Sequence, residues 1–307
     1  MNQPDLSVEI GGISLKNPVM SASGCYGYGK EYGAFYDVEK LGALVVKGTT
    51  LEPREGNPPP RIVETAAGIL NSVGLQNPGV EYFINEEIRT FSGSSIPLIV
   101  NIAGNLEEEY IRLAEKLDPV KEVSGLEVNI SCPNVKKGGM AFGTDVECAH
   151  RLVKGVRAVT SKPLIVKLSP NVTDITGVAL AAQEAGADAL SLINTLLGMA
   201  IDIHSRKPVL GNVLGGLSGP AVKPVALRMV WQVSEKVRIP VVGMGGIMTA
   251  EDALEFIMAG ASAVAVGTAN FINPLAIPDI IEGIAGYMIE NNIREFKELI
   301  GAARKGA

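Results

Sequence analysis

The stretch "PLIVKLSPNVTDITGVALAAQEAGADALSLINT", residues 163–195, contains the unit from which the fold is predicted. Its two ends, 163–169 and 189–195, are short runs rich in Val, Ile and Leu without strict polar alternation, as in parallel strands that are covered on both faces. Residues 175–187 between them have the pattern of an amphipathic helix. A strand, a helix and a strand in this order indicate two parallel strands joined by a helical crossover.

The same alternation runs through the whole chain. Further helical patterns cover 105–117, 145–159 and 249–260. Including the two runs above, eight apolar runs are predicted to be strands: 17–23, 43–50, 97–104, 125–131, 163–169, 189–195, 240–247 and 263–269. Strand and helix alternating eight times predict an α/β fold, a (β/α)₈ TIM barrel formed by residues 1–307 as a single domain. The opening "VEIGGISL" (8–15) predicts an N-terminal β-hairpin.

A doubly wound open sheet is the competing architecture. Such a sheet that binds a dinucleotide carries G-x-G-x-x-G after its first strand. The stretch "GCYGYG" (24–29) has glycines at its first, fourth and sixth positions and lacks that spacing, which favours the barrel.

Composition argues against nucleic acid and membrane partners. A net charge of −6 does not suit a protein that binds a phosphate backbone through a basic face. The longest uncharged stretch, 256–278, contains Pro, Asn and Gly, so we interpret it as folded core and not as a membrane span. Residues 1–10 lack the features of an export signal, so we expect a cytoplasmic location.

Three connections are longer than ordinary barrel loops: 51–78, 132–144 and 196–218. Each follows the carboxyl end of a predicted strand, which is the face where barrel enzymes have their active sites. We therefore expect these segments to form substrate walls and lids.

Two lysines lie at the ends of otherwise apolar strands. Burying Lys47 and Lys167 without an anionic partner would be costly, so their positions predict bound negative charge. Either side chain could instead extend to solvent, which is a weaker explanation for two lysines at equivalent positions.

Amides gather at the same predicted rim. A primary amide can accept one hydrogen bond and donate two, so a group of them matches the N–H and C=O edge of a pyrimidine or of a flavin. Each could alternatively form a turn or a helix cap. The four amides are Asn71, Asn101, Asn129 and Asn194.

Glycines follow the last two predicted strands, in "GMGGI" (243–247) and "GTAN" (267–270). Barrels commonly hold a phosphate at this place on backbone N–H groups, and glycine permits the close approach. These segments therefore predict a phosphorylated cofactor.

The three cysteines, Cys25, Cys132 and Cys148, are far apart, so neither a disulfide nor a metal site is expected. Cys132 follows the fourth predicted strand in a glycine-rich loop, where a thiol can act as general base or nucleophile. Cys148 and Cys25 are expected to be inert. His150 lies in a helical pattern and is expected to be structural. His204, in the long connection after the sixth predicted strand, could approach the rim but has no apparent acidic partner, which disfavours a Cys-His hydrolase.

Seven segments, taken together and in this order, resemble the dihydroorotate dehydrogenases. The resemblance runs from about Val19 to Asn270, with a cysteine in place of the serine of the membrane-associated class. The segment "CPNVKKGGMAFG" (132–143) is most similar to the subclass that works with a separate iron–sulfur flavoprotein subunit (class 1B). The seven segments are "VVKGTT" (45–50), "NSVGLQNPG" (71–79), "VNIAG" (100–104), "NISCPNVKKGG" (129–139), "LINT" (192–195), "GMGGI" (243–247) and "VGTA" (266–269).

The resemblance implies one FMN per chain and a substrate lying on the flavin ring. The residues expected around FMN are Ser23, Lys47, Gly48, Asn101, Asn129, Lys167, Ile193, Gly219, Gly245, Gly246, Gly267 and Thr268. Those expected to contact dihydroorotate are Lys47, Asn71, Ser72, Val73, Gly74, Leu75, Asn129, Asn194 and Thr195, with backbone N–H groups acting in 72–75.

The resemblance also implies the reaction. Cys132 would take a proton from C5 of dihydroorotate while a hydride leaves C6 for the flavin, giving orotate for pyrimidine biosynthesis. Lys167 would stabilise charge on the flavin and Lys47 would pair with the substrate carboxylate. Electrons would reach NAD⁺ through a partner subunit with FAD and a [2Fe-2S] centre, in a heterotetramer of two catalytic and two electron-transfer chains.

Three alternatives stay open on the sequence. A stand-alone dihydroorotate dehydrogenase would form a homodimer and use fumarate. A Schiff-base lyase would use Lys47 or Lys167 as a covalent amine in a similar barrel. A non-catalytic scaffold would bind no FMN and would not need Cys132.

Overall fold

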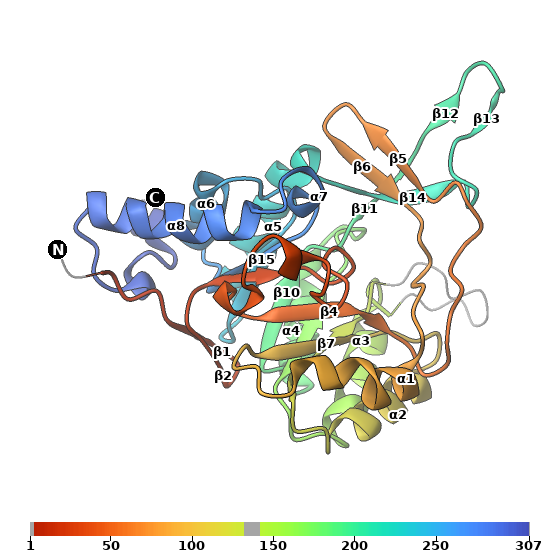
Figure 1. The fold of residues 1–307 in the computed structure, drawn as a ribbon, viewed down its shortest axis with the longest axis horizontal. Helices are drawn as coiled ribbons and strands as arrows, with labels where there is room; N and C mark the ends of the chain where they lie inside the picture. Colours follow the sequence, from red (N-terminus) through yellow and green to blue (C-terminus); the bar gives the residue numbers. More distant parts are fainter. Residues whose placement is uncertain (1–2, 132–141, 307) are drawn as a thin grey trace.

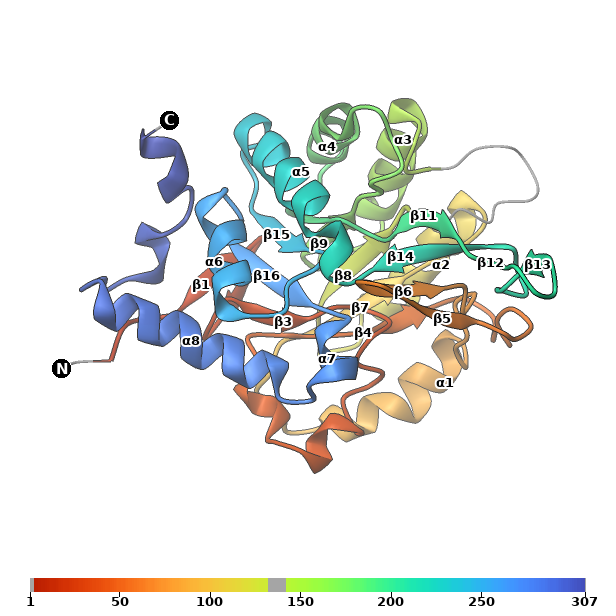
Figure 2. The same cartoon turned by 90° about the horizontal axis from the view of Figure 1, so that it is seen from above.

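The computed structural model describes residues 3–131 and 142–306, and Figures 1 and 2 show the chain from two sides. Its centre is a sheet of eight parallel strands in the order β3-β16-β15-β10-β9-β8-β7-β4. The strands are β3 (Val19–Ser21), β4 (Leu44–Thr49), β7 (Leu98–Ile102), β8 (Val123–Asn129), β9 (Leu164–Lys167), β10 (Ala189–Leu192), β15 (Val241–Met244) and β16 (Ala263–Val266). All eight predicted strands are confirmed, with shorter bounds.

The two end strands of this sheet meet. Met20 of β3 forms a β-bridge with Ala43, and the Ser21 N–H donates to the Ala43 carbonyl at 3.3 Å. The Ser21 hydroxyl also accepts from the Val45 N–H at 2.9 Å. Contact between the first and last strands closes the sheet into a barrel and excludes the open doubly wound alternative.

Helices surround the barrel, as Figure 2 shows. The helices are α1 (Val80–Asn85), α2 (Glu107–Leu117), α3 (Val146–Arg157), α4 (Ile175–Glu184), α5 (Lys223–Lys236), α6 (Ala250–Met258), α7 (Ala269–Ile272) and α8 (Ala276–Glu290). No helix in the described part of the chain is both long enough and apolar enough to cross a bilayer.

The first strand is an exception to the predicted alternation of strand and helix. Only two short 3₁₀ turns, Tyr32–Ala34 and Val38–Lys40, lie between β3 and β4. Gly24, Gly27 and Gly29 in this connection have φ of +82°, +58° and +85°, which are incompatible with a right-handed helix.

The N-terminal hairpin closes one end of the barrel. Its strands are β1 (Val8–Ile10) and β2 (Ile13–Leu15), joined by two glycines with positive φ. Ile10, Ile13 and Leu15 are buried in the same cluster as the inward-facing residues of the barrel, such as Ile99 and Ile165. The bottom of the barrel is therefore a packed apolar plug.

Successive side chains of a barrel strand point to opposite sides, so they belong to two separate apolar clusters. In β9, Leu164 and Val166 pack outward among the helices, while Ile165 faces the apolar interior. Lys167 has the same inward direction as Ile165 because strand side chains repeat every two residues. Its place at the carboxyl end of β9 puts its charge above the apolar plug.

Two of the three long connections, which were expected to form substrate walls and lids, contain strands. Residues 51–78 contain β5 (Ile62–Thr65) and β6 (Gly68–Asn71). Residues 196–218 contain β11 (Leu196–Met199), β12 (Ile201–Asp202), β13 (Lys207–Pro208) and β14 (Leu214–Ser218). Four of these strands form a separate sheet in the order β11-β14-β6-β5, and β12 pairs with β13 in a protruding ribbon (Figure 1). The third connection, 132–144, lies mostly outside the described residues.

Candidate active site

The carboxyl ends of four neighbouring barrel strands form a polar layer above the apolar plug. It contains Asn101 on β7, Glu127 and Asn129 on β8, Lys167 on β9 and Ser191 on β10, all at most 8% exposed. The sequence predicted the two asparagines and the lysine at this rim, and the structure brings them together.

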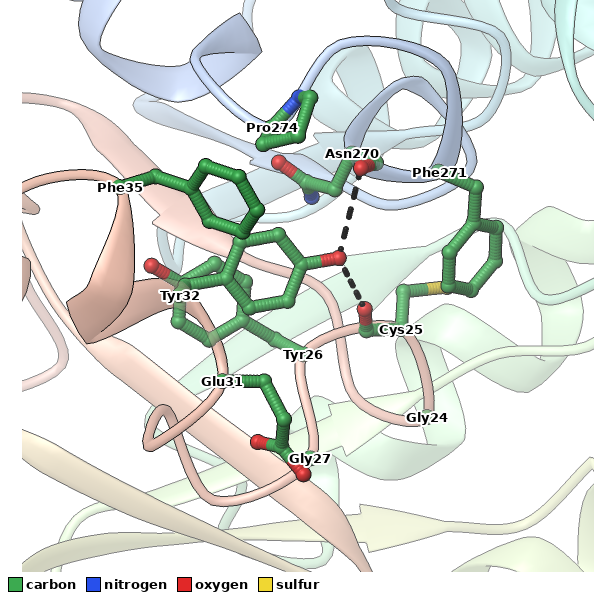
Figure 3. Close-up of a pocket in the computed structure, with 10 residues that line it drawn as sticks. All are labelled: Gly24, Cys25, Tyr26, Gly27, Glu31, Tyr32, Phe35, Asn270, Phe271 and Pro274. Atoms are coloured by element: carbon green, nitrogen blue, oxygen red, sulfur yellow. Dashed lines mark hydrogen bonds between the residues drawn. The ribbon is translucent and has the colours of Figure 1, made fainter.

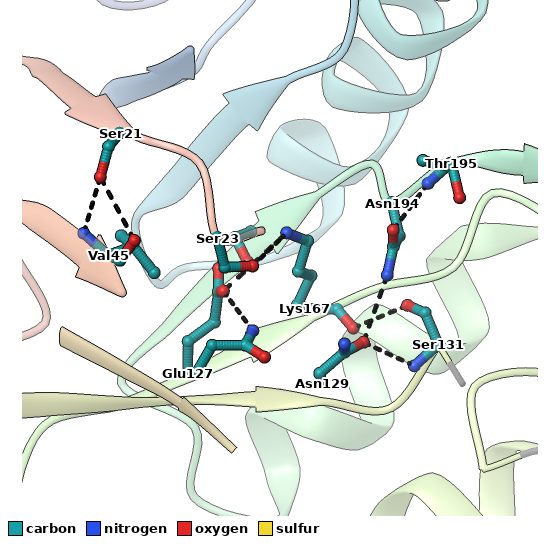
Figure 4. Close-up of polar contacts among 11 residues, drawn as sticks. Ser21, Ser23, Val45, Glu127, Asn129, Ser131, Lys167, Asn194 and Thr195 are labelled. Carbon is teal, nitrogen blue, oxygen red and sulfur yellow. Dashed lines mark hydrogen bonds and ion pairs between the residues drawn. The ribbon is translucent and has the colours of Figure 1, made fainter. Parts of the chain in front are cut away.

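Lys167 has a partner that the prediction did not include. Its Nζ lies 3.9 Å from Oε2 of the buried Glu127 and donates to the Ser23 hydroxyl at 3.1 Å (Figure 4). The expectation that Lys167 needs a bound anion is therefore wrong in part, since a carboxylate of the chain already lies beside it.

Glu127 was missed in the sequence. It carried a signal, because a carboxylate inside the apolar run "GLEVNIS" (125–131) cannot be buried without partners. Its Oε2 accepts from Asn101 Nδ2 at 2.6 Å, and its Oε1 accepts from the Ser191 hydroxyl at 2.7 Å. Asn101 and Glu127 are direct neighbours in the register of β7 and β8.

The amide of Asn129 is fixed by its neighbours. Its Oδ1 accepts from Asn194 Nδ2 and from the Ser131 N–H, each at 3.2 Å (Figure 4). Asn194 Oδ1 in turn accepts from the Thr195 N–H at 2.8 Å. Because the oxygen of Asn129 is occupied, its NH₂ group is the part that can serve a ligand.

Lys47 and Gly48 lie where the pairing of β4 with β7 is irregular. Such an irregularity redirects a strand side chain. Lys47 is half-buried and forms no ion pair with another described residue. A Cβ on Gly48 would lie 3.1 Å from Asn101 Oδ1 and 3.1 Å from Leu75, so glycine lets the segment around Leu75 approach the rim.

The segment 71–75 is held by the second sheet. The Gly216 carbonyl accepts from Asn71 Nδ2 at 3.4 Å, and Gly216 pairs with Asn71 in the register of β14 and β6. The Ser72 N–H donates to the Arg61 carbonyl at 2.7 Å. The expectation that this N–H binds the substrate is therefore wrong. The buried Ser72 hydroxyl has no hydrogen-bond partner among the described residues.

Three glycines expected around FMN lie together. Gly219, Gly245 and Gly246 have φ of +99°, +120° and +79°, and a Cβ on Gly246 would lie 2.9 Å from the Gly219 carbonyl oxygen. The N–H groups of Gly246 and Thr268 donate to no other described residue. Such free N–H groups beside glycines suit a phosphate.

One pocket joins most of these groups. We call this pocket the inner pocket. Its volume is about 80 Å³, which is too small for a whole nucleotide cofactor, so such a cofactor would extend beyond it. Predicted residues among its lining are Ser23, Lys167, Ile193, Asn194, Thr195, Gly219, Gly245, Gly246, Gly267 and Thr268. The pocket combines apolar walls, a lysine and free backbone N–H groups, and these fit the ring and the phosphate of a flavin mononucleotide. Lys47, Gly48, Asn101 and Asn129 do not line it.

A second cavity of about 380 Å³, here called the outer cavity, is shown in Figure 3, and Cys25 lines both it and the inner pocket. The hydroxyl of Tyr32 donates to the Cys25 carbonyl at 3.2 Å, and Phe35 and Phe271 form part of the wall. Burial raises the pKa of the Cys25 thiol to about 11, although nearby Lys167 acts in the opposite direction. Cys25 is therefore a neutral thiol near neutral pH, as expected.

The remaining candidates are outside the site or outside the described residues. Cys132 lies in 132–141, which the structure does not describe. Cys148 is buried on α3, as expected, and His150 is half-buried on the same helix. His204 is exposed between β12 and β13, where its backbone N–H donates to the Asp202 carboxylate. No three His, Cys, Asp or Glu side chains of the described part of the chain gather as a metal site would require.

A family model supports the resemblance seen in the sequence. The model for dihydroorotate dehydrogenase matches residues 5–288, which include the whole barrel and both connections that form the second sheet.

Close relatives cover nearly the full chain. A protein of Geotalea uraniireducens (strain Rf4) is 61% identical over 302 residues, 98% of this chain and 99% of its own length. One of Desulforamulus reducens (strain ATCC BAA-1160 / DSM 100696 / MI-1) is 62% identical over 299 residues, 97% of this chain and 98% of its own. Both carry the name dihydroorotate dehydrogenase B (NAD(+)), catalytic subunit. A barrel with this rim, matched along almost its entire length, belongs to the dihydroorotate dehydrogenase family.

Proposed function

We propose that this chain is the catalytic subunit of a dihydroorotate dehydrogenase B, which oxidises dihydroorotate to orotate in pyrimidine biosynthesis. The observation that carries the proposal is the polar layer at the carboxyl ends of β7 to β10, in a chain about 60% identical to proteins of that name. The family is flavin-dependent, and the flavin proposed here is one FMN.

FMN would be held by the groups around the inner pocket. The free N–H groups of Gly246 and Thr268 would receive the phosphate, and Lys167 would face the polar edge of the ring. Ile193 would pack on the ring because it lines the same pocket and is 3% exposed. The other proposed contacts are Ser23, Lys47, Gly48, Asn101, Asn129, Gly219, Gly245 and Gly267.

Dihydroorotate would bind between the rim and the segment 71–75. The substrate carboxylate would pair with Lys47, whose ammonium has no ion-pair partner among the described residues. The amides of Asn71, Asn129 and Asn194 would bind the pyrimidine edge, with Thr195 and the segment Ser72 to Leu75 completing the site. Because the Ser72 N–H is already bonded to Arg61, we assign the backbone contacts to Val73, Gly74 and Leu75.

Oxidation removes a proton from C5 and a hydride from C6 of dihydroorotate and leaves the C5–C6 double bond of orotate. Bound flavin supplies the acceptor for the hydride. Cys132, as thiolate, would take the C5 proton, because it follows β8 in the segment that resembles the active-site loop of the family. The fixed amides of Asn129 and Asn194 would hold the ring so that C5 faces this base.

Electrons would leave through a second polypeptide. The relatives are named as catalytic subunits of an NAD(+) enzyme, which supports a separate electron-transfer subunit. We propose that this partner carries FAD and a [2Fe-2S] centre, that two copies of each chain form a heterotetramer, and that the assembly works in the cytoplasm. The stand-alone fumarate-using enzyme is the alternative.

The spectrum of the purified chain tests the proposal. The chain should bind one FMN and appear yellow, and anaerobic dihydroorotate should bleach it. NAD⁺ should then be reduced only after the partner is added. A colourless chain that borohydride traps with a carbonyl substrate would instead indicate a Schiff-base lyase, and brisk fumarate reduction by the isolated chain would favour the stand-alone class.

A further inference from the structure

Glu127 is a buried carboxylate with partners on three neighbouring strands. It is 3% exposed and contacts Asn101 of β7, Lys167 of β9 and Ser191 of β10. Both carboxylate oxygens accept hydrogen bonds, at 2.6 and 2.7 Å. A buried carboxylate needs hydrogen-bond donors and a positive partner, and Glu127 has both.

A purely structural role, holding four strands in register, does not account for the identity of the partners. Apolar side chains would hold the strands at least as well, since a buried ion pair gains little over well-packed apolar residues. Lys167 of this group lines the inner pocket, and Asn101 approaches Gly48 on the neighbouring strand β4. Glu127 itself is not among the residues that line the pocket, so it acts on a bound ring through these neighbours.

We propose that Glu127 is a positioning residue that fixes Lys167 and Asn101 and lowers the reduction potential of the flavin. The inference rests on the proposed function, because it requires FMN in the inner pocket. Lys167 alone would strongly favour a reduced flavin that bears negative charge. The carboxylate 3.9 Å from Lys167 Nζ cancels part of that effect, since charges in a buried site are only weakly screened.

The balance between Lys167 and Glu127 suits a site that must pass its electrons on. A flavin that is too easily reduced would retain them, whereas reduction of a nicotinamide requires a low-potential donor. Glu127 therefore sets how far the site favours the reduced cofactor. The Ser23 hydroxyl, which accepts from Lys167 Nζ, helps to hold the ammonium in place.

E127Q is the test, because it keeps the shape and removes the charge. A glutamine can still accept from Asn101 and donate to the Ser191 oxygen. The midpoint potential of bound FMN, measured by a redox titration with a reference dye, should shift to a more positive value. Equivalently, the ratio of the dissociation constants of oxidised and reduced FMN should rise about tenfold.

Two variants separate charge from packing. Ser191→Ala removes a hydrogen bond of Glu127 but keeps the carboxylate, so the melting temperature should fall while the potential stays at the wild-type value. Glu127→Asp carries the test if E127Q does not fold: its side chain is one methylene shorter and draws the carboxylate back from Lys167, so the potential should again become more positive, by less than in E127Q. An unchanged or more negative potential in the Glu127 variant that is measured, or a shift in Ser191→Ala, would overturn the proposal.

Failure of this inference can be told apart from failure of the proposed function. If the wild-type chain binds no flavin, the function is wrong and the inference falls with it. If the wild-type chain is reduced by dihydroorotate and E127Q has the wild-type potential, only the role of Glu127 is wrong.

Discussion

The ammonium of Lys167 donates to the hydroxyl of Ser23 at 3.1 Å, although 144 positions separate the two residues. In the barrel, β16, β15 and β10 lie between the strands that lead to them, so Lys167 reaches across the open end. Lys47 on β4 has no ion pair with a described residue, whereas Lys167 lies beside Glu127. The two lysines are therefore expected to serve different ligands.

Replacing each lysine by alanine should separate these ligands. Lys47→Ala should weaken binding of dihydroorotate and orotate about 10- to 100-fold, because the substrate carboxylate then faces a desolvated rim without a partner. FMN should remain bound. Titration of the flavin spectrum with orotate measures this loss.

Lys167→Ala should act on the flavin and leave Glu127 as a buried charge without its counter-ion. We expect loss of FMN occupancy or a more negative potential of the FMN that remains. Swapped results, with flavin lost in Lys47→Ala and orotate affinity lost in Lys167→Ala, would exchange the two assignments.

Cys132→Ala should bind FMN and orotate but reduce its flavin 10²- to 10⁴-fold more slowly with dihydroorotate, the usual effect of losing a placed base. In the wild-type chain the same step, followed by anaerobic stopped flow, should accelerate as pH rises through the pKa of the thiol and then level off. Cys132→Ser should fall between and need higher pH. A wild-type rate in Cys132→Ala would remove Cys132 from the reaction.

The barrel could be predicted from the sequence because its signals are local. Each of the eight apolar runs has the composition of a strand that is buried on both faces of a parallel sheet. Residues 175–187 likewise have the amphipathic pattern of a helix within their own sequence. The prediction was wrong after the first strand, where positive φ at Gly24, Gly27 and Gly29 replaces the helix by turns. It also treated 51–78 and 196–218 as loops, because β6 and β14 are stabilised by each other and not by their own sequence.

The candidate site was predictable one residue at a time. Lys167, Asn101 and Asn129 are polar residues at the ends of apolar strands, and that pattern placed them correctly at one rim. Asn71 was expected at the same rim but lies on β6 of the second sheet. The role of Glu127 was not apparent, because the contact with Ser191 joins residues 64 positions apart. The engagement of the Ser72 N–H by Arg61 likewise depends on how two segments meet, which only the folded chain determines.

The two cysteines outside 132–141 should be unreactive in the folded chain. Burial raises the pKa of Cys25 to about 11, so at pH 8 almost none of it is thiolate, and Cys148 is 4% exposed. In Cys132→Ala, iodoacetamide should label neither thiol at pH 8, and labelling of Cys25 should accelerate only as pH approaches 11. Mass spectrometry after urea unfolding at pH 8, where both thiols should react, provides the control. Rapid labelling of native Cys25 at pH 8 would contradict the raised pKa of this thiol.

The plug at the bottom of the barrel depends on a glycine turn. Gly11 has a φ of +55°, and a Cβ there would lie 2.8 Å from Cβ and from the backbone oxygen of Asp188. Gly11→Ala should therefore lower the free energy of unfolding by about 1–3 kcal/mol, measured by urea denaturation. Gly286→Ala on α8 is the matched control, since no atom lies within 4 Å of its added Cβ and alanine favours a helix. Equal stability of both variants would mean that the hairpin does not support the barrel.

An exposed apolar surface beside the outer cavity is where the electron-transfer partner should dock. Phe35, Phe271 and Ile272 are 59%, 55% and 70% exposed, and the cavity that the two phenylalanines line meets the inner pocket at Cys25. Electrons leaving the flavin need a partner centre close to it, and a patch of large apolar side chains on a protein surface is typical of an interaction site.

Phe271→Glu should keep the rate at which dihydroorotate bleaches the flavin, but lower NAD⁺ reduction in the presence of limiting partner by about tenfold or more. Ile289→Glu on α8, at a residue 38% exposed that lines neither cavity, should leave both rates unchanged. Equal NAD⁺ reduction by the two variants at limiting partner would show that the partner docks elsewhere.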